Sequence, residues 1–231
     1  MFNGKMKAIT FSYDDGVTQD RRLVEMMNRY GVKGTFNLNS EMLDTKGELW
    51  AGDIRINRDT VTHDEVKTLY AGHEVACHTL THPNLTELSD EEVIRQVEND
   101  RQNLSRLAGY EVVGMAYPCG GENNNDHVAA LIREHTGVRY CRTIAWNYSY
   151  APQTNLYRFN PTVYHQEMDK MWELAEDFLK MEATTPQLLY IWGHSYEFDP
   201  SGNWERFEEF LQFISGREDV FYGTNREVFG I

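Results

Sequence analysis

Cysteine is scarce in this chain of 231 residues, and its few copies form no pairing pattern. Cys77, Cys119 and Cys141 are odd in number, and no two of them stand in a Cys-x-x-Cys spacing. This distribution argues against a disulfide-built scaffold and against a zinc site made of thiolates. We expect buried free thiols, with a redox or minor ligand role open for Cys77 and Cys119, which lie beside the candidate chemistry.

Positive charge and long apolar runs are lacking as well. The chain has 22 Lys and Arg against 36 Asp and Glu, a formal net charge of -14, and no basic cluster offsets it. We therefore expect neither nucleic acid nor an anionic membrane as a partner. No run of about 18 apolar residues occurs and residues 1–6 are not a basic-then-apolar leader. The chain as given is expected to be soluble and cytoplasmic, with its oligomeric state left open.

Apolar and aromatic residues, at 41% and 13%, suffice for one large core, and residues 1–231 are expected to form a single domain. Short β-prone runs alternate with helical periods. Strands are expected at 7–11, 34–38, 74–76, 112–116, 138–144, 188–192 and 220–222, and helices at 18–30, within 62–72, and at 89–109, 126–135, 165–181 and 204–214. Residues 39–59 read as a polar excursion. Such α/β units imply parallel strands, and about seven of them favour a barrel.

Two short motifs far apart in the sequence carry the candidate chemistry. His78 and His82 are separated by three residues, and a β-prone run ends abruptly on Asp14 and Asp15. Neutral imidazole and carboxylate suit zinc or a similar divalent ion, and three protein ligands leave a fourth position for water. Two histidines and one aspartate would therefore form a metal site and leave one carboxylate for proton transfer.

Each motif alone has an ordinary structural explanation. Histidines at this spacing can lie on the surface of a helix, and Asp-Asp-Gly is most often a solvated turn. Pro83 and the β-prone run before His78 favour a loop after a strand over a helix. The metal site is favoured because both motifs occur together, each at the end of a predicted strand.

Polar groups lie at the carboxyl ends of five of the predicted strands. Because the carboxyl ends of parallel barrel strands share one mouth, we expect these groups to converge there. They are Asp14 with Asp15, His78 with His82, the Pro118 turn, Arg142, and His194.

The order of these motifs resembles that of the polysaccharide deacetylases, carbohydrate esterase family four, which are metal-dependent hydrolases on an irregular (β/α) barrel. Residues 12–16, Ser-Tyr-Asp-Asp-Gly, resemble the family's Thr-Phe-Asp-Asp-Gly, and residues 78–82 resemble its His-[Ser/Thr]-x-x-His. The resemblance implies Asp14 as general base and a metal held by Asp15, His78 and His82. One divalent ion is expected, zinc first, with cobalt, nickel or manganese as alternatives.

Two further segments are similar to family motifs. Tyr117-Pro118-Cys119 is similar to the turn that shapes the substrate groove, which implies that the Cys119 N–H helps to hold the oxyanion. Residues 189–194 resemble the strand that delivers the catalytic acid, here His194. The other groove residues expected are Arg142, Trp146 and Trp192.

The chain also departs from the family pattern in two places. The family has an arginine two residues before its proline, where this chain has Ala116, and Arg142 is the candidate replacement. The aspartate that tunes the acid histidine has no match, so the partner of His194 is left open. Glu197 and Asp199 are interpreted as rim charges.

The predicted function is hydrolysis of carbon–nitrogen bonds, most directly removal of N-acetyl groups from a glycan or amino sugar. Metal-activated water would attack while Asp14 takes a proton and His194 protonates the leaving amine. The expected substrate is an N-acetylated carbohydrate or a small amide. One alternative is a hydrolase of small amides or cyclic imides, similar to allantoinases. A non-catalytic glycan-binding module is the other, although binding alone needs no acid and base.

Overall fold

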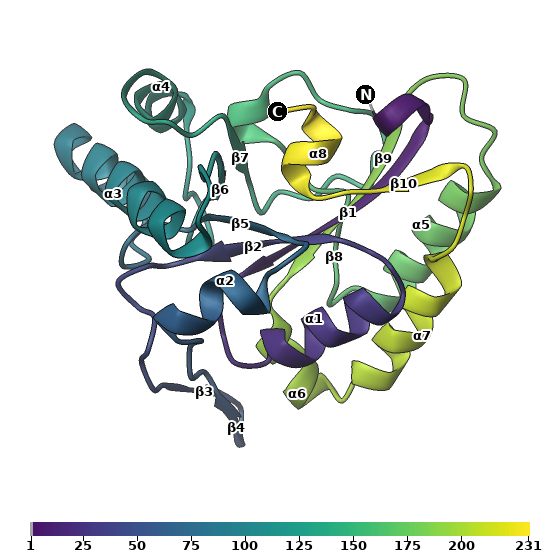
Figure 1. Cartoon of the computed structure of the whole chain (residues 1–231), viewed down its shortest axis with the longest axis horizontal. Coiled ribbons are helices and arrows are strands. Elements are labelled where there is room, and N and C mark those ends of the chain that lie inside the picture. Colours follow the sequence, from purple (N-terminus) through teal and green to yellow (C-terminus); the bar gives the residue numbers. More distant parts are fainter. Residues whose placement is uncertain (1) are drawn as a thin grey trace.

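The computed structural model describes residues 2–231, and one curled sheet of parallel strands forms its centre (Figure 1). Seven strands follow one another in the order β7-β6-β5-β2-β1-β9-β8, and β10 pairs with the first half of β1. The α/β barrel-like fold with about seven parallel strands is confirmed. The strands are β1 (Lys7–Asp14), β2 (Gly34–Leu38), β5 (Glu74–Cys77), β6 (Gly114–Ala116), β7 (Tyr140–Arg142), β8 (Val163–Tyr164), β9 (Gln187–Gly193) and β10 (Val220–Tyr222).

Residues 159–164 join the two edges of this sheet. The amide of Phe159 donates to Cys141 O at 2.9 Å on the β7 side, while Val163 pairs with Ile191 of β9. A single parallel bridge between Arg142 and Phe159 is the extent of the pairing with β7. The barrel is therefore irregular, closed on one side by a segment with little regular pairing.

Helices cover the outside of the sheet and bury apolar stripes against it (Figure 1). Leu23, Val24 and Met27 form one such stripe, at the spacing of a helical face. Among the described helices, none has both the length and the apolar content needed to cross a bilayer. The helices are α1 (Asp20–Arg29), α2 (Val66–Leu69), α3 (Asp90–Ala108), α4 (Asp126–His135), α5 (Met168–Lys180), α6 (Phe198–Ser201), α7 (Trp204–Ile214) and α8 (Asn225–Phe229).

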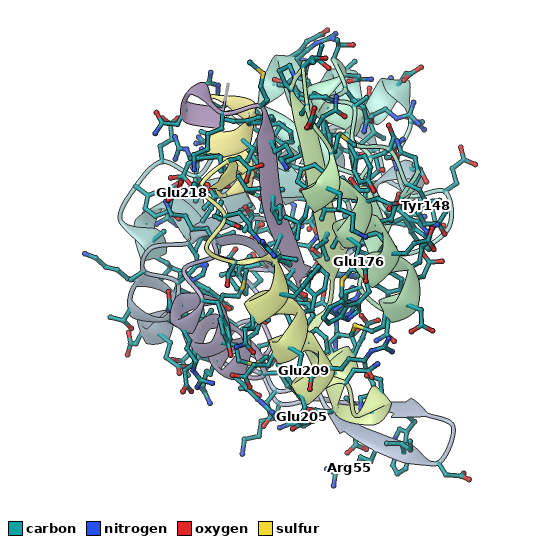
Figure 2. The ribbon with its side chains drawn as sticks, turned by 90° about the vertical axis from the view of Figure 1, so that its right-hand side faces the viewer. Arg55, Tyr148, Glu176, Glu205, Glu209 and Glu218 are labelled. Carbon is teal, nitrogen blue, oxygen red and sulfur yellow. The ribbon has the colours of Figure 1, made fainter. Side chains whose placement is uncertain are left out.

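Several expected elements differ in extent or were missed. Strands expected at 112–116 and 138–144 are only three residues long, because only three residue pairs of these segments are in parallel register. Residues 39–59 contain an antiparallel hairpin, β3 (Glu48–Ala51) and β4 (Ile54–Asn57), which projects from the body together with Arg55 (Figure 2). The segments β8, α6 and α8 are too short to give a clear periodic pattern.

A buried polar network lies between β5, β7 and α8. Glu74 accepts hydrogen bonds from the hydroxyls of Thr35 and Tyr140, both at 2.9 Å, and from the Arg226 amide. The Tyr140 ring passes over Gly114, where an added Cβ would lie 2.1 Å from the hydroxyl oxygen. Gly114 is therefore required for Tyr140 to reach the buried carboxyl group.

We predict that Gly114→Ala lowers the free energy of unfolding by about 2 kcal/mol or more, because the methyl group would displace Tyr140 from Glu74. Urea denaturation measures the change. Gly120→Ala is the matched control, since an added Cβ there meets nothing within 4 Å. Equal stability of both variants would show that Tyr140 can relax without losing its hydrogen bond.

Candidate active site

The two adjacent aspartates lie where β1 ends, between β2 and β9. Asp15 continues the pairing with β2, since its amide donates to Asn37 O at 3.0 Å. Asp15 and Gly16 then adopt positive φ angles of 79° and 60°. An added Cβ on Gly16 would lie 2.8 Å from the Leu38 side chain. This tight turn leaves both carboxylates buried, at 1% and 4% exposure, on the inner side of the sheet.

The two histidines lie on the loop that follows β5, so the helix-face alternative is wrong. The His78 amide donates to Leu38 O at 2.9 Å and to the Asp100 carboxyl group at 3.1 Å. Thr79 and His82 both adopt left-handed backbone conformations, with φ angles of 71° and 61°. Such conformations are costly for residues other than glycine and gather at functional sites.

The side chains of Asp15, His78 and His82 meet in one cluster. Asp15 Oδ1 is 3.6 Å from His78 Nε2 and 3.4 Å from His82 Nε2. Ligands bound tetrahedrally to zinc at about 2.0–2.1 Å would lie roughly 3.3–3.4 Å apart. The Oδ1 atom is also buried without any hydrogen-bond partner among the described residues. Spacing, donor types and this unpaired oxygen together fit one divalent cation.

His78 is oriented for metal binding by a backbone contact. Its Nδ1 lies 2.9 Å from Ala116 O, so this nitrogen carries the proton and the lone pair of Nε2 faces the cluster. Burial lowers the pKa of His78 to about 4, although Asp14 partly offsets the effect. The ring is therefore neutral at pH 7, as a metal ligand must be.

Arg58, just after β4, contacts the other oxygen of the Asp15 carboxylate. Its Nη2 donates to Oδ2 at 2.8 Å. Burial alone would raise the pKa of Asp15, but His194, His78 and Arg58 hold it well below its usual range. Asp15 is thus an ionised ligand. Sequence reasoning missed Arg58, which lies in a polar excursion that carries no motif.

The second carboxylate, Asp14, is held by a buried arginine. Arg142 lies at the end of β7, is 0% exposed, and its Nη2 donates to both carboxylate oxygens, at 2.5 Å to Oδ1. The Asn37 side chain donates to the same oxygen at 2.8 Å. Position 116 is Ala116 in this chain and cannot contact Asp14 as an arginine could. Arg142 makes the contact with Asp14 from β7.

His194 lies at the same cavity as Asp14, with Nε2 3.9 Å from Asp14 Oδ2. Burial by itself would lower the pKa of His194, but Glu197, Asp15 and Asp14 outweigh it and raise that pKa to about 9. Glu197 is not the rim charge expected from the sequence, because its carboxylate lies 3.2 Å from His194 Nδ1 and is mostly buried. Asp199 does lie outside the site.

A cavity of about 360 Å³ opens onto these groups. Arg142 lies buried beneath the cavity, whereas Pro118 and Trp146 are not part of its wall. The expected site residues that line the cavity are Asp14, Asp15, His78, His82, Tyr117, Cys119, Trp192 and His194. The other lining residues are Leu49, Arg58, Gly120, Ile144 and Tyr196.

Trp192 and Cys119 line the cavity and also contact other residues of the site. Trp192 is only 5% exposed and lies between the Tyr164 ring, at 4.5 Å, and the Arg142 guanidinium, at 4.6 Å. Cys119 Sγ lies 3.7 Å from Nδ1 of His82, and burial raises the pKa of its thiol. The Asp/His/His cluster includes neither Cys119 nor Cys77.

A curled parallel sheet with an Asp/His/His cluster at the carboxyl ends of its strands defines a barrel-type α/β protein with a candidate divalent-metal centre. Residues 3–140 match the family model described as polysaccharide deacetylase, and the chain belongs to that family. The chain is 27% identical over 123 residues to a bifunctional xylanase/deacetylase of Pseudobutyrivibrio xylanivorans, covering 53% of this chain and 18% of that protein.

A chitin deacetylase of Colletotrichum lindemuthianum is 29% identical over 112 residues, covering 48% of this chain and 41% of that protein. This chain thus spans less than half the length of both curated relatives. Among solved structures, peptidoglycan deacetylase PdaC from Bacillus subtilis shares the fold, with a TM-score of 0.57 and 16% identity over 97% of this chain and 91% of that one.

We predict that His78→Ala combined with His82→Ala abolishes stoichiometric zinc binding, because only one ligand of the cluster is left. Elemental analysis of protein dialysed against zinc measures this. His127→Ala is the matched control, since His127 is exposed, contacts Asp90 and lies outside the cluster. Unchanged zinc in the double variant would rule out the Asp/His/His site.

We predict that Arg142→Met lowers the free energy of unfolding of the metal-free protein by about 3–5 kcal/mol, because the buried Asp14 carboxylate loses its charge partner. Arg142→Met combined with Asp14→Asn removes both charges and should recover most of that loss. Urea unfolding of the single and double variants measures both effects. A double variant as unstable as the single one would assign the stabilisation to other Arg142 contacts, such as that with Trp192.

Proposed function

We propose that the protein is a metal-dependent hydrolase that removes N-acetyl groups from a glycan or an amino sugar. The observation that carries this proposal is the placement of a carboxylate and an imidazole, Asp14 and His194, beside one Asp/His/His cluster at the same cavity. A binding module would need neither an acid nor a base.

The Asp15, His78 and His82 side chains would hold the ion, and their oxygen and imidazole donors suit zinc. When bound, the ion supplies Lewis acidity and a bound water of lowered pKa. Cobalt, nickel and manganese accept the same donor set. Because deacetylation needs no redox change, the ligand geometry matters more than the identity of the metal.

The side chains of this chain then perform the proton transfers. Asp14 accepts a proton from the attacking water, while Arg142 and Asn37 fix the orientation of its carboxylate. His194 donates a proton to the departing nitrogen. An amide requires this second transfer, because an unprotonated amine is a poor leaving group. Cys119 lines the cavity, and its backbone N–H would donate to the carbonyl oxygen as negative charge develops there.

An N-acetylated carbohydrate is the substrate best supported by the relatives, one of which is named a chitin deacetylase. The formal net charge of -14 also favours a neutral or cationic substrate over a polyphosphate. The cytoplasmic location stays a prediction.

The test is release of acetate by zinc-loaded protein from oligomers of N-acetylglucosamine, with small N-acyl amides and cyclic imides in parallel. Acetate from the oligomers supports the proposal. Cleavage of the small compounds alone would assign the allantoinase-like alternative. Tight binding of the oligomers without any cleavage would assign a glycan-binding module.

We predict that Asp14→Asn reduces turnover by about 10² or more while zinc stays bound, because the base is lost and the metal ligands are retained. Acetate release and zinc content are measured on the same preparation. Asp199→Asn, at an exposed carboxylate outside the cavity, is the control. Unchanged turnover of Asp14→Asn would remove Asp14 from the role of base.

A further inference from the structure

The turn after β9 brings one carboxylate and two imidazoles together beside the cavity. Glu197 Oε2 accepts hydrogen bonds from the His194 amide at 3.1 Å and from His165 Nε2 at 2.7 Å. The same oxygen lies 3.2 Å from His194 Nδ1, a buried nitrogen that makes no aligned hydrogen bond with the described residues, and Oε1 accepts from the Tyr164 hydroxyl. The Glu197 side chain is 17% exposed, so most of this hydrogen-bonded cluster is shielded from solvent.

The fold fixes this cluster through two adjacent strands. His165 directly follows β8, and its amide donates to Trp192 O of β9 at 2.9 Å. An added Cβ on Gly193 would lie 2.3 Å from the His165 ring, so glycine is needed directly before His194. Glu197 ends a single 3-10 turn, Ser195–Glu197, that starts from His194 and folds its carboxylate back under that histidine.

The hydrogen bonds of His165 define which groups carry protons. His165 is fully buried, and its Nδ1 lies 3.4 Å from the Tyr13 hydroxyl, which has a proton to donate. Burial lowers the pKa of His165, so its ring is neutral with the proton on Nε2, facing Glu197. Burial would raise the pKa of Glu197, but His165 and His194 hold it well below its usual range. Glu197 is therefore an ionised acceptor.

We propose that Glu197, held by His165 and Tyr164, is the positioning carboxylate that orients His194 and keeps the proton on its Nδ1. This rests on the proposed function, in which His194 is the acid. Nε2 is then the nitrogen that faces Asp14 and the cavity. Glu197 takes the place of the aspartate motif that the sequence lacks.

Every proton can be followed through the cleavage of the C–N bond. The Nε2–H bond of His194 breaks as the departing nitrogen gains that proton and the bonding electron pair of the C–N bond. His194 is left neutral with its proton on Nδ1, and Glu197 stays ionised throughout. Asp14 afterwards releases the proton taken from water, and His194 takes one up from solvent.

The experiment compares two substrates that differ in their need for an acid. Glu197→Gln in zinc-loaded protein is assayed on an N-acetylglucosamine oligomer and on 4-nitrophenyl acetate, whose phenolate leaves without protonation. We expect kcat on the amide to fall by about 10²-fold, and kcat on the ester by less than about 3-fold. Asp199→Asn is the matched control, because Asp199 accepts from Gln19 and Trp204, does not contact His194, and should leave both rates unchanged.

Tyr164→Phe provides a second variant that keeps the carboxylate. It removes only the donor to Oε1 and should give a smaller loss, again confined to the amide. Equal losses on both substrates in Glu197→Gln would make Glu197 a merely structural residue, and no loss on either would overturn its positioning role.

Failure of the proposed function gives a different pattern, in which the unaltered protein cleaves neither substrate. The ¹⁵N chemical shifts of the His194 ring then test the inference without turnover. A protonated Nδ1 in the unaltered protein that changes in Glu197→Gln supports the positioning role. Identical shifts in the two proteins would overturn it.

Discussion

The ion pair between Arg142 and Asp14 ties the sheet and the candidate site together. In the sheet order, β6, β5 and β2 separate the strands that carry these two residues, so the contact spans the inside of the curled sheet. Both side chains are almost fully buried, and a buried carboxylate without a partner is strongly destabilising. The contact that positions the proposed base therefore depends on the curl of the sheet, and Trp192 packs against the arginine at 4.6 Å.

The metal cluster depends on backbone geometry as much as on its ligands. Four of the eight described non-glycine residues with positive φ lie in the site loops, namely Asp15, Thr79, His82 and Cys119. Asp100 of α3 accepts hydrogen bonds from the amides of Ser40 and His78, which fastens the histidine loop to a helix. Burial raises the pKa of Asp100 to about 7. Buried polar contacts that fix each loop offset the free-energy cost of these backbone conformations.

The chain lacks two residues of the family pattern that it resembles, and in both places another charged side chain contacts the group concerned. Arg142 reaches Asp14 from the strand next to the one that ends at Ala116. Glu197 reaches His194 from three residues further along the same turn. A charge that stabilises a base or orients an acid acts through distance and burial, not through its position in a motif. Divergence of a motif is thus compatible with the same local electrostatics.

The alternation of strands and helices could be predicted from the sequence, because side-chain periodicity depends on residue type and short spacing. The same is true of the candidate residues Asp14, Asp15, His78, His82 and His194, whose ligand chemistry follows from residue type. Their surroundings, in contrast, depend on the folding of distant segments onto one another. Arg58 contacts Asp15 across 43 residues, His165 meets Glu197 across 32, and residues 159–164 close the sheet between β7 and β9. Such contacts follow from strand register and from the curl of the sheet. No local pattern encodes either of these features. Arg58 and His165 lie in no recognisable motif, so the sequence does not indicate that they belong to the site.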